Sequence, residues 1–143
     1  KGSDPREALK HWHYMIGLSI GLLVVLRIVL RVTAPTPLIA PAPSALQDRL
    51  AKLAHFALYL LMIGMPLAGW LLLSAEGKPI PFFGLELPPL IGKDKTLAKQ
   101  IKDLHATVGE AGYFLIGAHA LAALFHHYVR RDNTLQRMLP ARG

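Results

Sequence analysis

This sequence contains no cysteine. Disulfide bridges, thiolate metal sites and cysteine nucleophiles are therefore excluded. Acidic residues are also scarce: 9 Asp and Glu stand against 16 Lys and Arg, which gives a formal net charge of +7. The basic residues lie at the ends of apolar runs and not along a polar face, so they suit the flanks of membrane spans better than a nucleic-acid surface. We therefore expect no nucleic-acid partner.

Polar residues as a whole are in the minority, since 52% of the chain is hydrophobic and the mean hydropathy is +0.36. Three long apolar stretches occupy about residues 13–32, 53–75 and 103–129. A helix of about 20 residues is about 30 Å long, which matches the hydrocarbon core of a bilayer. Pro66 in the second stretch is tolerated as a kink inside a membrane. We predict an all-α transmembrane helix bundle, with residues 1–143 forming one domain of three spans in a lipid bilayer.

Two connections of different character join the three spans. The first, residues 33–49, is proline-rich and expected to be extended, with Ser44 and Asp48 as candidate helix caps. The second, residues 76–99, contains prolines and glycines that prevent a long helix, and we expect it to lie over one mouth of the bundle.

The connections define two faces of the bundle. We call side A the face with the N-terminus and residues 76–99, and side B the face with residues 33–49 and the C-terminus. Lys and Arg divide evenly between the sides, so the positive-inside rule does not orient the chain. The smaller number of acids on side B favours a cytoplasmic side B.

Histidines recur at two depths of the predicted bundle. His105 and His119 are fourteen residues apart, which places them about 21 Å apart along a helix and within about 40° of each other around it. His13 begins the first span and lies level with His105. His55 and His119 lie in the half near side B, and His126 lies at the side B edge. One helix therefore presents imidazoles in the same direction at two depths.

Small residues accompany these histidines. Gly17 follows His13 by four residues, and Gly109 follows His105 by four. A haem is a flat plate whose iron takes axial imidazoles, and small residues one turn away let the helix backbones approach it. Two stacked haems would fit one bilayer thickness, so the pattern favours haem ligation.

Other readings of the same residues remain open. A single histidine inside a span is commonly a hydrogen-bonded interior residue or a proton relay, and the GLSIG motif also suits helix packing. A zinc site would need a third or fourth donor at one depth. A copper site would more often include Met or Cys. The match in depth between His13 and His105 favours haem over these alternatives.

Several stretches of the sequence carry a resemblance to a known family. They are His13 fourteen residues before Arg27 and then Arg31, the PTP that follows, LAHFALYLLMIGMPLAGW, LHATVGEAGYFLIGAH and the closing HHYVRRDNTLQRMLP. Together they resemble the bacterial cytochrome b561 family over almost the whole chain. The resemblance implies a four-helix bundle of the bacterial inner membrane that holds two b haems, in a family with members that oxidise superoxide and reduce ubiquinone. It also implies that His13 and His105 ligate the haem nearer the periplasm, that His119 ligates the second haem, and that side B is cytoplasmic.

One departure from the family pattern concerns the second haem. Family members have a further N-terminal span whose histidine supplies the other ligand of the haem bound by His119. This sequence begins at Lys1, where the loop after that span would be, without an initiator methionine or a signal peptide. We therefore expect a fragment or a processed product. If no such span exists, ligation by His55 and His119 is the alternative.

Charged residues suggest how substrates would be handled. Superoxide is a small anion, and a lysine cluster near His105 on side A would attract it, or would only solvate the loop. The cluster consists of Lys93, Lys95, Lys99 and Lys102. On side B, His126 is a candidate for proton delivery to a bound quinone. Arg27 and Arg31 are candidates to bind haem propionates, or they anchor the helix end.

Two classes of redox function follow. The first is an oxidoreductase of the superoxide:ubiquinone type, in which electrons cross a multi-pass inner-membrane protein from superoxide to ubiquinone. The second is a haem b electron-transfer subunit that docks to a partner dehydrogenase and has no substrate of its own. A membrane scaffold whose histidines are structural is the non-redox alternative.

Overall fold

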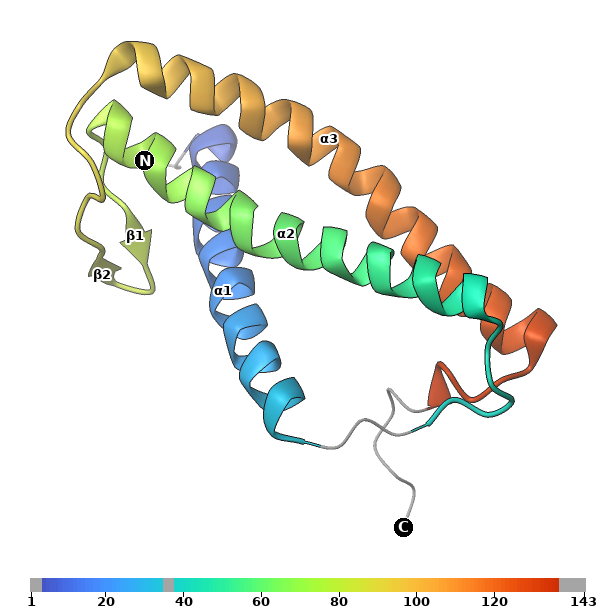
Figure 1. The fold of residues 1–143 in the computed structure, drawn as a ribbon. Coiled ribbons are helices and arrows are strands. Elements are labelled where there is room, and N and C mark those ends of the chain that lie inside the picture. The colour runs from blue at the N-terminus through green and yellow to red at the C-terminus, as the bar shows by residue number, and fades with distance from the viewer. Residues whose placement is uncertain (1–3, 35–37, 137–143) are drawn as a thin grey trace.

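The computed structural model describes residues 4–34 and 38–136, so the PTP sequence lies outside the described residues. Three long helices account for most of the chain (Figure 1): α1 (Pro5–Thr33), α2 (Ala45–Glu76) and α3 (Lys95–Phe125). A π-helical turn, η1 (His126–Arg130), continues α3. Each helix is long and apolar enough to cross a membrane. The prediction of an all-α transmembrane bundle with three spans is confirmed, although each helix begins earlier than its predicted span.

Short polar side chains begin each helix. The Asp4 side chain accepts a hydrogen bond from Arg6 N (3.0 Å) at the start of α1. Ser44 and Gln47 form a reciprocal capping box at the start of α2, and Asp94 Oδ1 accepts hydrogen bonds from Thr96 N (2.9 Å) and Leu97 N (3.0 Å) at the start of α3. These bonds satisfy amide groups that have no partner within the helix. Ser44, but not Asp48, is the cap.

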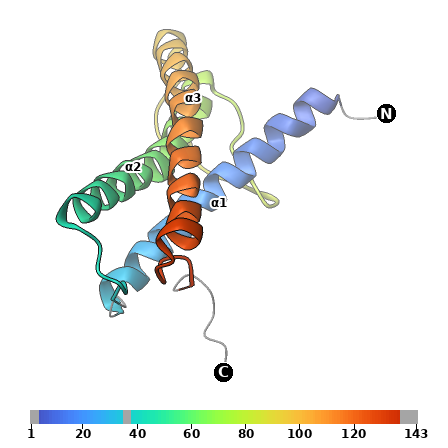
Figure 2. The same cartoon turned by 90° about the vertical axis from the view of Figure 1, so that its right-hand side faces the viewer.

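Helix α2 lies between the other two helices and packs against both (Figure 1). Figure 2 shows α1 crossing α3 obliquely. Glycines mark the close approaches: a Cβ added at Gly21 of α1 would lie 3.1 Å from Pro66 Cβ, and one added at Gly112 of α3 would lie 2.9 Å from Leu61 Cδ2. Small residues at such points let membrane helices pack closely. Helix α2 continues through Pro66 without interruption.

The outer surface of the helices is apolar. Leu22 and Leu23 of α1 and Phe114 and Leu121 of α3 are all more than half exposed. Exposed apolar side chains along the helices are unsuited to water and suited to hydrocarbon. The bundle therefore fits a lipid environment.

The connection between α2 and α3 contains a short antiparallel hairpin, β1 (Pro81–Phe82) and β2 (Leu85–Glu86), which was not predicted from the sequence. Its turn uses positive φ angles at Phe83 (48°) and Gly84 (84°). The connection is tied to α2 by Trp70 Nε1, which donates to Pro88 O (3.0 Å), and by Ser74 Oγ, which accepts from Leu90 N (3.1 Å). It lies at the side A end of α2, and β1 also contacts α1 (Figure 1).

Candidate functional site

Four histidines from the three helices form two pairs. His13 of α1 and His105 of α3 have ring centroids 6.0 Å apart and planes inclined at 76°. His55 of α2 and His119 of α3 have ring centroids 5.4 Å apart and planes inclined at 72°. The structure therefore brings together the histidines that were expected at each of two depths, and α3 contributes one ring to each pair.

The His13–His105 pair has the chemistry of haem ligands. The ring centroids, 6.0 Å apart, lie close enough for both imidazoles to reach one bound group. In addition, His105 Nδ1 is buried and has no hydrogen-bond partner among the described residues. Burying an unpaired ring nitrogen is costly, so this ring fits a role in which a bound group supplies further bonds.

Donors in the described ranges come in pairs and not in larger clusters. Residues 4–34 and 38–136 contain no group of three or more His, Cys, Asp or Glu side chains placed to hold a metal ion. Structural zinc sites take four protein donors and catalytic zinc sites three. Paired imidazoles are one donor set that can hold a haem through two protein ligands. The residues present fit haem b.

Glycines beside the histidines differ in their surroundings. A Cβ added at Gly17 would meet nothing within 4 Å, whereas one added at Gly109 would lie 3.4 Å from Met65 Cε. A Cβ at Gly69 of α2 would lie 3.6 Å from His105 Cε1. Open space therefore lies beside Gly17, while Met65 fills the space beside Gly109. Gly69 was not predicted as a site residue, because no histidine lies one helical turn from it in the sequence. It comes close to His105 only because α2 packs against α3.

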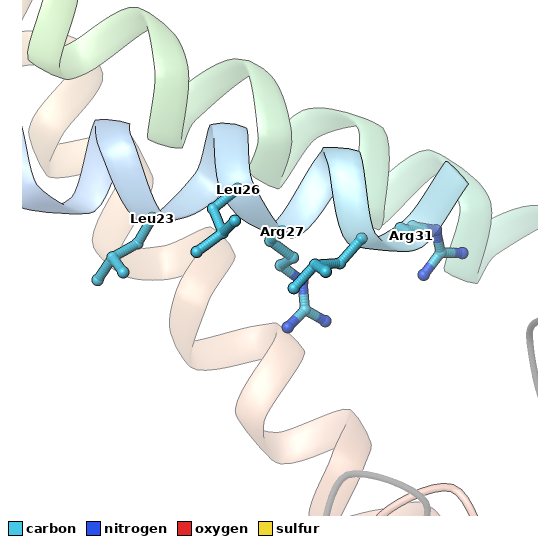
Figure 3. A pocket seen from close by; sticks show the side chains of 5 residues that line it. Leu23, Leu26, Arg27 and Arg31 are labelled. Atoms are coloured by element: carbon cyan, nitrogen blue, oxygen red, sulfur yellow. The ribbon is translucent and has the colours of Figure 1, made fainter. Parts of the chain in front are cut away.

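Arg27 and Arg31 line a shallow hollow of about 390 Å³ on α1, toward side B (Figure 3). Leu23, Leu26 and Leu30 complete its wall. Neither guanidinium forms an ion pair within the part of the chain that the structure describes. Two cations beside an apolar wall suit the carboxylates of an otherwise apolar ligand.

A second hollow, which we call the lysine hollow, opens on side A between the end of α2 and the start of α3. It has a volume of about 380 Å³, and its lining residues are Glu76, Lys78, Lys95, Ala98, Lys99 and Lys102. Three of the four predicted lysines therefore meet there. Lys93 does not line it, because its side chain lies over Gly77, the left-handed cap of α2.

Lys78 takes the place expected for Lys93 in this cluster. Its Nζ lies 2.8 Å from Glu76 Oε2. The hydrogen bond to Glu76 raises the pKa of Lys78 above its ordinary value, against a smaller opposing effect of lost hydration, so its ammonium stays charged. Lys78 could not be predicted from the sequence as part of this cluster, because the cap of α2 at Gly77 that brings it there is a feature of the fold.

His126, at the side B edge, is held by the buried carboxylate of Asp132, which the sequence pattern does not indicate. His126 Nδ1 lies 2.5 Å from Asp132 Oδ2, and Asp132 is only 5% exposed. Thr134 N donates to Asp132 Oδ1 (3.0 Å). Burial by itself raises the pKa of Asp132, but the hydrogen bonds from His126 and Thr134 outweigh it and lower the pKa to about 2.

Comparisons with known proteins agree with this arrangement. The family model described as prokaryotic cytochrome b561 matches residues 2–141. "Cytochrome b561 homolog 1" of Escherichia coli (strain K12) is 39% identical over 142 residues, which cover 99% of this chain and 81% of that protein. "Probable superoxide oxidase CybB" of Yersinia pestis is 40% identical over 143 residues, which cover 98% of this chain and 81% of that protein. "Cytochrome b561 homolog 2" of Escherichia coli (strain K12) is 34% identical over 128 residues, 89% of this chain and 68% of that protein.

These relatives and the three apolar helices define a multi-pass protein of the bacterial inner membrane. Its helical bundle, its paired histidines and its family model agree on membrane electron transfer with haem b. The chain therefore belongs to the prokaryotic cytochrome b561 family.

Proposed function

We propose that this protein oxidises superoxide at side A, the periplasmic face, and reduces ubiquinone, so that electrons cross the bilayer. The observation that carries the proposal is the lysine hollow, which lies at the end of the bundle where His13 and His105 meet. The name of the Yersinia pestis relative, a probable superoxide oxidase, supports the same substrate.

Two haem b groups are the proposed cofactors. His13 and His105 would ligate the haem nearer side A, and His119 would ligate the haem nearer side B. His55 lies beside His119 and is its proposed partner within this chain, whereas the family resemblance assigns that place to a histidine on a preceding helix. Haem b supplies one-electron redox chemistry that protein side chains lack.

Other side chains would seat these groups. Gly17 leaves open space one turn from His13, and Gly109, with Met65 against it, lies one turn from His105. Arg27 and Arg31 would pair with haem propionates, because guanidinium groups bind carboxylates through two hydrogen bonds. The apolar side chains between the two depths would exclude water from the bundle.

The lysine hollow would concentrate the anion. Lys78, Lys95, Lys99 and Lys102 surround it and Glu76 is the acidic residue in its lining, so the local charge is strongly positive. A concave surface with charges of one sign raises the encounter rate of a small counter-ion. Lys102 lies three residues before His105 on α3, which places the hollow close to the first histidine pair. Lys93, over Gly77, would add only a more distant charge.

At side B, His126 would deliver protons to the quinone. Ubiquinone needs two protons as well as two electrons to become ubiquinol, and imidazole exchanges protons near neutral pH. Phe125, Tyr128 and Val129, which lie near His126 in the sequence, expose apolar side chains at the membrane edge and would contact an apolar quinone.

Rapid mixing with superoxide tests the proposal. The purified holoprotein, loaded with ubiquinone, is mixed with superoxide, and the absorbance of reduced haem and the yield of ubiquinol are followed. We expect haem reduction faster than spontaneous dismutation, and its loss when superoxide dismutase is added first. Haem reduction no faster than dismutation would overturn the proposal, and reduction that occurs only with an added dehydrogenase would favour a docking electron-transfer subunit.

A further inference from the structure

The turn that follows α3 folds back on itself and closes around His126. Arg131 adopts a left-handed conformation (φ 53°), which reverses the chain and brings Asp132 next to His126. Asp132 N also donates to His126 O (3.2 Å), so backbone and side chain of Asp132 both bond to the same histidine. We call residues 126–134 the clasp.

Hydrogen bonds join the clasp to the connection between α1 and α2. Ala40 N donates to Asn133 Oδ1 (2.9 Å), and Asn133 N donates to Ala40 O (3.2 Å). These reciprocal bonds link segments that are 93 residues apart in the sequence. The position of Asp132 is therefore fixed by neighbours on both sides of it, and not by its contact with His126 alone.

The pair of Asp132 and His126 differs from the other ion pairs of the described residues. Lys52 and Asp48, on the same side of the bundle, pair with their side chains 74% and 48% exposed, whereas His126 and Asp132 are 24% and 4% exposed. An exposed pair contributes little and is readily lost. A buried carboxylate bonded to one nitrogen of a partly exposed imidazole instead fixes the ring and its tautomer.

We propose that Asp132 is a positioning residue that holds His126 for proton transfer to the quinone. This inference rests on the proposed function. The carboxylate of Asp132 accepts the Nδ1 hydrogen of His126, which leaves Nε2 as the nitrogen that exchanges protons. Nε2 forms no hydrogen bond within residues 4–34 and 38–136.

The proton and electron balance of the step is complete. Two superoxide ions each lose one electron and become dioxygen, and ubiquinone takes up these two electrons. His126 gives a proton from Nε2 to one quinone oxygen and takes a replacement proton from cytoplasmic water, while the second quinone oxygen takes its proton from cytoplasmic water. The carboxylate of Asp132 stays ionised and stabilises the imidazolium between these transfers.

Oxidation of prereduced holoprotein by ubiquinone-1 tests this role separately from superoxide. Asp132→Asn keeps an oxygen that can accept a hydrogen bond but removes the charge. We expect the rate of haem reoxidation by ubiquinone-1 to fall about tenfold or more, while haem content and the rate of haem reduction by superoxide stay at wild-type values. Asp132→Glu should restore part of the rate. Asp48→Asn, which removes an exposed acid from the same side, is the matched control and should change neither rate.

A double-mutant cycle separates positioning from a general loss of structure. In a His126→Gln background, Asp132→Asn should cause no further loss of rate, because Asp132 acts through His126. The nitrogen chemical shifts of His126 should also show Nδ1 protonated in the wild type and a mixture of tautomers in Asp132→Asn.

The outcomes distinguish the two proposals. A wild-type protein that ubiquinone-1 does not reoxidise contradicts the proposed function. Rapid reoxidation of both the wild type and Asp132→Asn overturns the role of Asp132 alone. An equal loss of rate on adding Asp132→Asn with and without His126 also overturns it, because the effect then does not pass through the histidine.

Discussion

Replacing Lys95, Lys99 and Lys102 together by Gln should slow the reaction with superoxide by an amount that depends on salt. We take about 6 Å as the distance between an anion in the hollow, whose volume is about 380 Å³, and each ammonium group that lines it. At that distance in water one pair of charges is worth about 0.7 kcal/mol, and three pairs about 2 kcal/mol.

Salt reduces this attraction in a calculable way. With a Debye length of about 10 Å at 0.1 M salt the three pairs retain about 1.1 kcal/mol, and with about 3 Å at 1 M they retain about 0.3 kcal/mol. These energies correspond to rate losses of about sixfold at 0.1 M and less than twofold, about 1.7-fold, at 1 M. The triple variant should therefore approach the wild type as salt rises.

Stopped-flow measurement of haem reduction by superoxide between 0.01 and about 1 M salt checks this prediction. The matched comparison is Lys99→Gln against Lys93→Gln, since the two lysines lie near the same end of the bundle but only Lys99 lines the hollow. Lys93→Gln should have the smaller effect. A triple variant with the salt dependence of the wild type would refute steering by the lysine hollow.

Three further predictions concern packing, pH and capping. Gly21→Ala places a Cβ 3.1 Å from Cβ of the rigid Pro66 ring. Its free energy of unfolding in detergent should be about 1–3 kcal/mol below that of Gly117→Ala, where a Cβ meets nothing within 4 Å. Equal free energies of unfolding for the two variants would contradict close packing of α1 on α2. The pKa of Asp132 is lowered from 3.8 to about 2, so its contribution to stability is present above pH 3.8 and is lost as the pH falls toward 2. The amide chemical shift of Thr134 should therefore change with pH in that window. A chemical shift that stays constant there would contradict the hydrogen bond from Thr134 N to Asp132. Asp94→Ala removes the two cap bonds of α3 and should lower the free energy of unfolding by about 1 kcal/mol, measured by chemical denaturation, whereas no change would mean that the cap is not stabilising.

The helices and the histidine pairs were predictable because both follow from local regularities. Apolar length gave the three spans, and helical periodicity gave the common direction of His105 and His119. The equal depth of His13 and His105 was predictable because consecutive spans alternate in direction. The first and third spans therefore run the same way, and both histidines lie near side A. Their ring separation of 6.0 Å confirms that the two residues meet.

The remaining features depend on tertiary folding and left no periodic signal. The lysine hollow contains Lys78 and not Lys93, because the side chain of Lys93 lies over Gly77, the cap of α2. Asp132 reaches His126 only because Arg131 reverses the chain. The hairpin over side A was hidden by its prolines, which are uncommon inside strands.

We propose that His105 and His119, on one helix, serve two different haems. Haem content per chain, measured by the pyridine haemochrome spectrum, tests it in the wild type, in His105→Ala, in His119→Ala and in the double variant. We predict that each single variant loses part of the wild-type haem, with different parts of the reduced spectrum missing, and that the double variant retains none. A double variant with the haem content of the wild type would contradict the claim.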